Sequence, residues 1–173
     1  MKVLAFFMRF AVFAPLCLIA WWWLMPYYGW LIGQIAAQVI GLFGERISAV
    51  RIEADGIFNT ETLLTLETAS GAQTDKIGSV VTNMAPFIAL VLATAGLGVK
   101  RRIRVLGIGT GILMVSHVIY LVWVVALSPN VRESPEVPIV VAQLFITLPF
   151  LLWIVLAYWR NIIELMASDD SQS

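Results

Sequence analysis

The sequence contains few residues that could carry out chemistry. It has a single cysteine, Cys17, and a single histidine, His117, which excludes an intrachain disulfide and any multi-cysteine metal site. Only 13% of the residues are charged and the formal net charge is zero, so nucleic acid is not expected as a partner. We therefore expect no cofactor and no bound metal.

Apolar residues make up most of the chain. Of the 173 residues, 60% are hydrophobic, and the mean hydropathy is +0.89, far from the composition of soluble globular domains. Seven Trp, nine Phe and four Tyr suit a protein anchored at both interfaces between lipid and water. The composition predicts an integral membrane protein with membrane lipid as a partner.

The N-terminal apolar run resembles a signal peptide because Lys2 and Arg9 precede it. The run ends, however, in Trp21–Trp23 followed by Met-Pro-Tyr-Tyr. This is an aromatic interfacial belt and not the small-residue pattern that a signal peptidase requires. We expect residues 3–25 to be a retained first span.

Length and apolar content predict the remaining spans, because a helix crosses the hydrocarbon with about 20 apolar residues. The predicted spans are residues 3–25, 80–99, 105–127 and 138–159. The segment 27–43 carries Gln34 and Gln38 on one side, which predicts an amphipathic helix that lies in the interface. We thus expect an all-α membrane protein, a single membrane domain over residues 1–173, with four spans.

The distribution of Lys and Arg predicts the topology, because basic residues in short loops stay in the cytoplasm. With four spans both termini are cytoplasmic, in a bacterial inner membrane, and the basic loop at 100–104 is also cytoplasmic. If residues 27–43 crossed the membrane, this loop would lie outside.

The extracytoplasmic side then receives one sizeable polar segment. Residues 48–54 alternate apolar with polar side chains, Asp55-Gly56 supplies a turn, and residues 62–68 return to β-favouring types. The pattern predicts a small β-hairpin or meander over residues 46–70. A sheet of this size needs support from the helices or from a partner.

Thr82 and Asn83 lie where the second predicted span begins, shortly before Pro86. One interpretation is helix N-capping, in which a short polar side chain accepts backbone N–H bonds and proline is tolerated nearby. The other is a site at a helix N-terminus that stabilises an anion or oxyanion.

His117 is the ionisable residue predicted deepest in the bilayer, and Tyr120 follows it on nearly the same helical face. His117 either hydrogen-bonds across helices or handles a ligand or proton. Gly107, Gly109 and Gly111 on the same helix predict close helix packing and not a nucleotide site, because no strand precedes them.

The order of these features resembles the exosortase and archaeosortase proteins. The resemblance covers most of residues 27–127: an amphipathic helix ending near Gly41–Gly44, an extracytoplasmic β segment, a helix that starts at the outer face, a basic loop and a further span with polar residues. The resemblance implies a membrane transpeptidase that cuts proteins at a C-terminal sorting tail. Such enzymes use a Cys at the start of a span, an Arg on the next span, and a further Arg or His.

This chain departs from that chemistry. The Thr82–Asn83 region occupies the position of the nucleophile, and His117 and Tyr120 replace the pattern that contains the Arg. Thiol chemistry therefore lacks its thiolate and its cation, and Cys17 lies on another helix. The chain is similar to the non-catalytic exosortase-associated membrane proteins, of the kind that accompanies exosortase H in Gram-negative bacteria.

The resemblance thus implies an accessory protein in protein sorting, with an exosortase or a sorting-tail protein as partner. Its remnant pocket would contain Thr82, Asn83, His117 and Tyr120, with no catalytic residue among them. Two alternatives are an unconventional membrane protease or transpeptidase of the exosortase-like fold, which works without the usual Cys or uses Cys17, and a small transporter or channel subunit. The second is disfavoured because transport needs ionisable groups along a pathway.

Overall fold

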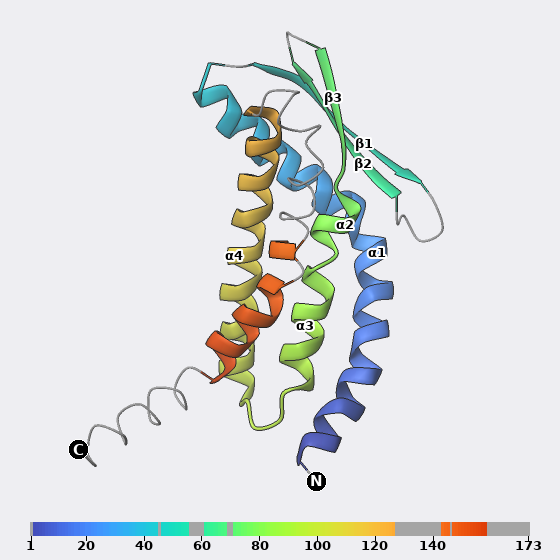
Figure 1. Cartoon of the computed structure of the whole chain (residues 1–173), viewed down its shortest axis with the longest axis vertical. Coiled ribbons are helices and arrows are strands. Elements are labelled where there is room, and N and C mark those ends of the chain that lie inside the picture. The colour runs from blue at the N-terminus through green and yellow to red at the C-terminus, as the bar shows by residue number, and fades with distance from the viewer. Residues whose placement is uncertain are drawn as a thin grey trace, which may run out of the picture.

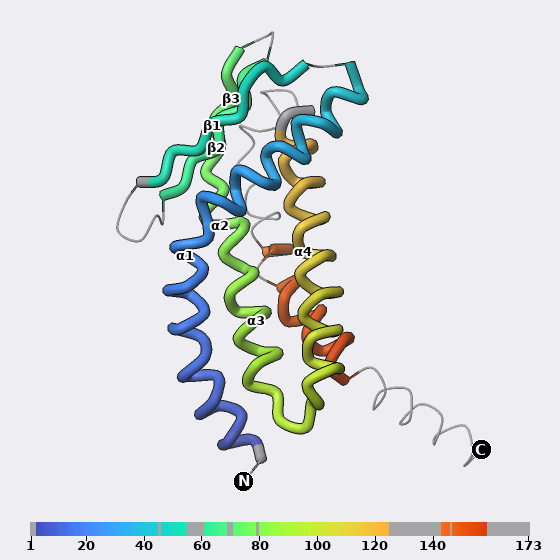
Figure 2. Tube along the Cα trace, turned by 180° about the vertical axis from the view of Figure 1, so that it is seen from behind, coloured from blue at the N-terminus to red at the C-terminus, as the bar shows by residue number. Residues whose placement is uncertain are grey.

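The longest element is α1 (Lys2–Leu42), a helix of 41 residues. The computed structural model describes residues 2–44, 46–55, 61–68, 71–126, 143–145 and 147–158. A straight helix of this length would measure about 60 Å, twice the thickness of the hydrocarbon core. Figure 2 shows that α1 bends, so that its second half slants over the upper ends of the neighbouring helices.

The predicted break between a first span and a separate helix at 27–43 is not present, because α1 continues through both segments. Pro26 lies inside the helix. Its ring removes one backbone hydrogen bond and crowds the preceding turn, which kinks a helix. In a membrane protein the neighbouring helices tolerate such a kink without a break. The residues predicted to be interfacial therefore form the second half of α1.

A three-stranded antiparallel sheet in the order β1-β2-β3 follows α1. The strands are β1 (Ile47–Asp55), β2 (Glu61–Thr68) and β3 (Gly71–Lys76). The first two confirm the predicted β segment. The third strand, β3, begins after residue 70, where the predicted β segment ends. Its residues are polar and have no alternating apolar pattern, so the sequence does not predict it.

The sheet has two different faces. Alternate residues of β2 are buried, including Leu64 and Leu66, and this face packs on the second half of α1 (Figure 1). Gly29 and Gly33 of α1 allow the close approach. A Cβ atom at Gly33 would lie 2.8 Å from Val50 Cγ1 and 2.9 Å from Leu64 Cδ1. The predicted support of the sheet by a helix is thus provided by α1.

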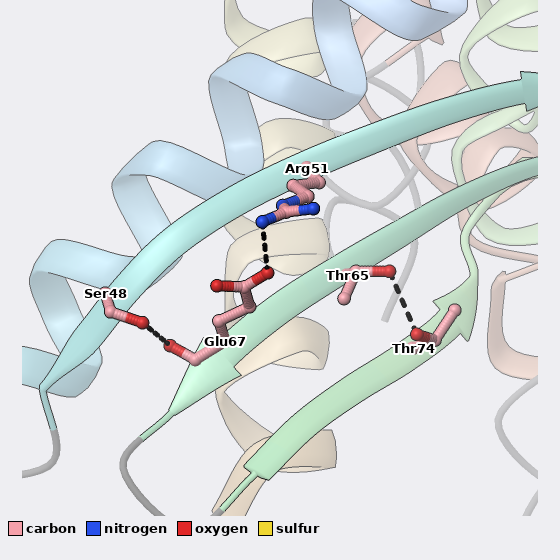
Figure 3. Close-up of polar contacts among 5 residues, drawn as sticks. All are labelled: Ser48, Arg51, Thr65, Glu67 and Thr74. Atoms are coloured by element: carbon pink, nitrogen blue, oxygen red, sulfur yellow. Dashed lines mark hydrogen bonds and ion pairs between the residues drawn. The ribbon is translucent and has the colours of Figure 1, made fainter.

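The opposite face of the sheet is polar (Figure 3). Arg51 of β1 and Glu67 of β2 form an ion pair at 2.9 Å. Ser48 Oγ donates to the Glu67 carbonyl at 3.1 Å, and the hydroxyls of Thr65 and Thr74 are 2.9 Å apart. These side chains point away from the helices, so this face suits contact with water.

The helices after the sheet are α2 (Gly78–Val81), α3 (Met84–Ala93) and α4 (Val99–Ala126). Residues 143–145 and 147–158 are also helical; we call them the last described helix, and it lies beside α4 (Figure 1). The turn from α3 to α4 uses Gly96, whose φ of 82° is favourable only for glycine.

Two of the described helices, α1 and α4, are long and apolar enough to cross a membrane. The helix α3 has ten residues, and the last described helix is also shorter than a full span. Four spans are therefore not confirmed. The helix α4 also begins earlier than the predicted residue 105, so the basic residues 100–104 belong to its first turns and not to a loop.

Candidate functional site

His117 lies at the centre of a buried polar network that joins several helices. It is completely buried in α4. Its Nδ1 atom is 2.7 Å from the Tyr28 hydroxyl of α1, and its Nε2 atom is 3.1 Å from Asn83 Oδ1, between α2 and α3. Of the two sequence interpretations of His117, the structure has the hydrogen bond across helices.

The direction of every hydrogen bond in this network follows from one backbone carbonyl. Asn83 Nδ2 donates to the Phe145 carbonyl at 3.2 Å, and a carbonyl can only accept. Asn83 Oδ1 therefore faces His117 as an acceptor, so His117 Nε2 carries the proton and donates it. The unprotonated Nδ1 then accepts from the Tyr28 hydroxyl. The network is consistent with a neutral imidazole.

Aromatic rings enclose the imidazole. The Phe145 ring stacks on it at a centroid distance of 5.5 Å and an interplanar angle of 19°. The Tyr28 ring meets it edge to face at 5.7 Å and 85°. This shell shields the imidazole from water and strengthens the hydrogen bonds that it makes.

The structure does not have the predicted N-capping by Thr82 and Asn83. Asn83 is the N-cap residue of α3, but its side chain makes no capping hydrogen bond, because both ends of its amide are engaged by His117 and Phe145. The Thr82 hydroxyl donates back to the Gly78 carbonyl, one helical turn earlier. At Asn83, hydrogen bonds to residues distant in the sequence replace the local capping bond.

Tyr120 lies near this network without being part of it. Its ring meets the Phe145 ring edge to face at 5.5 Å, and its hydroxyl donates to Asp75 Oδ2 of β3 at 2.9 Å. Tyr120 thus ties α4 to the sheet. Of the predicted pocket residues, Asn83 and His117 are in direct contact, while Tyr120 shares only the Phe145 ring with them.

A cavity of about 320 Å³ opens beside Thr82 and Asn83. Its other lining residues come from α1, α3 and the last described helix: Phe10, Ala14, Leu18, Pro86, Phe145, Pro149 and Phe150. The lining is almost entirely apolar, apart from the two polar side chains at one end. The space suits an apolar guest with one polar group.

Sequence reasoning missed three participants for different reasons. Tyr28 was assigned to the interfacial belt because it follows the Trp cluster closely. Phe145 contributes a backbone carbonyl, which every residue has, so no pattern could identify it. Asp75 lies on the unpredicted strand β3.

The structure does not bring Cys17 to this network. Cys17 is partly buried in α1, eleven residues before Tyr28, which corresponds to about 16 Å along a helix axis. The thiol and the imidazole therefore do not form a nucleophile–base pair in this arrangement. As a separate point, no group of three His, Cys, Asp or Glu residues within the described part of the chain could hold a metal ion.

Comparison with known proteins gives one clear match. The family model described as exosortase H-associated membrane protein matches residues 1–138, which include α1, the sheet, α3 and α4. Searches of curated proteins and of solved structures found no significant match. Because the family match covers more than half of the sequence and agrees with the apolar helices α1 and α4, the chain belongs to the family of exosortase H-associated membrane proteins.

Proposed function

We propose that this protein is a non-catalytic accessory protein of an exosortase-type protein-sorting system in the bacterial inner membrane, where it assists the presentation or processing of C-terminal sorting tails. The observation that carries the proposal is the family match over residues 1–138. The family name gives exosortase H as the associated protein, and we take it as the partner.

The polar network supports a structural role for His117. Its Nδ1 accepts from Tyr28 and its Nε2 donates to Asn83, so neither nitrogen is left to take a proton from a nucleophile. The Thr82 hydroxyl is engaged with a backbone carbonyl and does not contact the imidazole. An enzyme of this fold would need a base within reach of its nucleophile, and the network uses the chain's one imidazole to join helices.

The cavity beside Thr82 and Asn83 is where we place the contact with a sorting tail. A sorting tail contains an apolar helix, and small residues such as Ala14 in the wall allow close packing of helices in lipid. The Thr82 hydroxyl, which donates to the Gly78 carbonyl, can still accept a hydrogen bond from the residues that flank such a helix. This position corresponds to the nucleophile region in the sequence resemblance.

Filling the cavity tests this placement. Ala14→Leu puts a larger side chain into the lining, whereas Ala11→Leu makes the same change at an exposed position of α1. We expect Ala14→Leu to lower the fraction of a tail-bearing substrate that is processed and Ala11→Leu to leave it unchanged, as measured on gels of the tagged substrate. Equal processing in both variants, at equal protein levels, would contradict the placement.

The accessory role itself has a separate test. We expect a tagged copy, purified in mild detergent from its native membrane, to retain an exosortase or a tail-bearing protein in stoichiometric amount by mass spectrometry. Cys17→Ser should leave processing unchanged. Loss of processing in Cys17→Ser, at normal protein level, would make the unconventional enzyme the better explanation.

We also propose that the sheet faces the extracytoplasmic side. The α3–α4 turn, followed by residues 100–104, lies at the same end of the molecule as the start of α1, opposite the sheet (Figure 1), and basic residues stay in the cytoplasm. In a Cys17→Ser background, Glu53→Cys should react with a membrane-impermeant maleimide on intact spheroplasts and Lys100→Cys should not. The reverse labelling would refute this orientation.

A further inference from the structure

Positive charge gathers at the start of α4. Lys100, Arg101, Arg102 and Arg104 follow one another within five positions, and the first turn of α4 contains no acidic residue. The N-terminal end of a helix already carries a partial positive charge of about half a unit, so cations are unfavourable there unless an anion compensates them.

The described acidic residues cannot supply that anion, because all of them lie on the sheet. They are Glu53, Asp55, Glu61, Glu67 and Asp75. The ion pairs found within the described ranges are also on the sheet. Figure 1 shows the sheet at the opposite end of the molecule from the α3–α4 turn, so the basic cluster is separated from the strands that contain these residues by the length of the helices.

Two of the four cations are held in place by neutral groups. Arg101 Nη2 donates to the Ala157 carbonyl of the last described helix at 2.8 Å, and Arg102 Nη2 donates to the Thr94 carbonyl at the end of α3 at 3.0 Å. The Thr94 hydroxyl also accepts from Trp153 Nε1 at 2.8 Å. These bonds hold the two guanidinium groups without cancelling their charge, so the start of α4 remains positive.

The surroundings of the cluster favour a lipid as the source of the anion. Lys100 and Arg104 are exposed. Val99 and Ile103, which lie immediately before Lys100 and Arg104 in the sequence, are also exposed, at 72% and 65%. A surface that offers cations and apolar side chains side by side fits the boundary between headgroups and acyl chains. Free phosphate in water would make no favourable contact with these exposed apolar side chains.

We propose that Lys100 and Arg104, one helical turn apart on the exposed side of α4, form a binding site for the phosphate of anionic membrane lipids, with Val99 and Ile103 against the acyl chains and with Arg101 and Arg102 adding to the positive potential. The site anchors the α3–α4 end of the molecule at the membrane surface. It does not depend on the partner or on the sorting-tail cavity.

Titration of the full-length protein with single lipids tests the proposal. The protein is stripped of lipid in neutral detergent and titrated with dioctanoyl-phosphatidylglycerol or dioctanoyl-phosphatidylcholine, and native mass spectrometry gives the affinity of each. We expect tighter binding of phosphatidylglycerol. The double variant Lys100→Gln/Arg104→Gln should weaken it about thirtyfold, because each cation near an anionic headgroup contributes about a fivefold gain in affinity.

The matched control is Arg51→Gln/Lys76→Gln, which removes two cations from the sheet and should leave lipid affinity unchanged. Equal affinity for the two lipids, or equal losses in the two double variants, would overturn the proposal. Competition by inorganic phosphate at the lipid's own concentration would assign the site to free phosphate instead. Binding that emerges only after Asp169→Asn/Asp170→Asn would identify the chain's own acidic tail as the counter-ion.

Discussion

The contact between α3 and α4 depends on the absence of a side chain at Gly109. A Cβ atom at this position would overlap the ring of Phe87, coming within 2.8 Å of Cε2 and closer still to the rest of the ring edge. Phe87 is completely buried in the core cluster, so moving its ring would disturb the packing around it. At Gly107 and Gly111, two residues to either side, an added Cβ atom would have no neighbouring atom within 4 Å.

Alanine substitution of these three glycines distinguishes the effect of core packing on stability from the effect of helix propensity. Alanine in the interior of a helix is favoured over glycine by about 1 kcal/mol, and this gain applies equally to all three positions. Overpacking a dense core costs about 1–3 kcal/mol, and that cost applies only at Gly109. We therefore expect Gly109→Ala to lower the free energy of unfolding by up to about 2 kcal/mol net, while Gly107→Ala and Gly111→Ala raise it by up to about 1 kcal/mol.

Thermal unfolding in detergent, followed by circular dichroism, measures the difference. For a chain of this size 1 kcal/mol corresponds to about 2–4 °C in Tm, so Gly109→Ala should melt up to about 8 °C below the wild type and below the other two alanine variants. Phe87→Leu should relieve part of the loss when combined with Gly109→Ala, because the two positions are in contact. Equal Tm values for the three alanine variants would refute the packing argument.

Three further predictions concern the polar network and the sheet. Tyr28→Phe should lower the free energy of unfolding by about 1–3 kcal/mol because it leaves His117 Nδ1 buried without a donor. Tyr27→Phe, at a neighbouring position that is 76% exposed, should leave stability unchanged in the same melting assay. An equal loss at both positions would argue against the network. Gly33→Val should loosen the sheet from α1 and increase cleavage of the sheet by protease. Gly41→Val, which has open space around it, should not increase this cleavage, and unchanged cleavage in Gly33→Val would contradict the close packing. The exposed Arg51–Glu67 pair should contribute less than about 1 kcal/mol, so a large loss of stability in Arg51→Gln would show that this face of the sheet is not simply solvated.

Local patterns in the sequence predicted the class of the protein and part of the site. Alternation of apolar and polar residues identified β1 and β2, and the apolar runs identified membrane helices. Asn83 and His117 were singled out because polar groups are costly at membrane depth, and the structure brings the two side chains together. Of the glycines expected to pack closely, only Gly109 does so.

The features that were not predicted depend on distant partners. Pro26 is a usual place to end a helix, yet α1 continues because α4 and the sheet support its second half. The strand β3 is defined by its pairing with β2 and not by its own polar residues. The hydrogen bond from Tyr120 to Asp75 joins segments 45 residues apart in the sequence, and neither position has a pattern that indicates the other.

The network also explains how apolar helices reach one arrangement in lipid. Between such helices the hydrophobic effect supplies little preference for one rotation over another, and packing and interhelical hydrogen bonds decide. Tyr28, His117, Asn83 and the Phe145 carbonyl each come from a different segment. A shift of one residue along any of them turns its group by about 100° and breaks the chain of hydrogen bonds.

Two residues of the network complicate the use of mutations to locate function. Asn83 and Phe145 belong to the network and also line the cavity, so substitutions there change the packing of the helices together with the shape of the cavity. A loss of sorting in Asn83→Ala would not distinguish the two effects. Ala14 lines the same cavity without a hydrogen bond to the network, which makes Ala14→Leu, paired with Ala11→Leu, the substitution that separates recognition of a sorting tail from the stability of the helices.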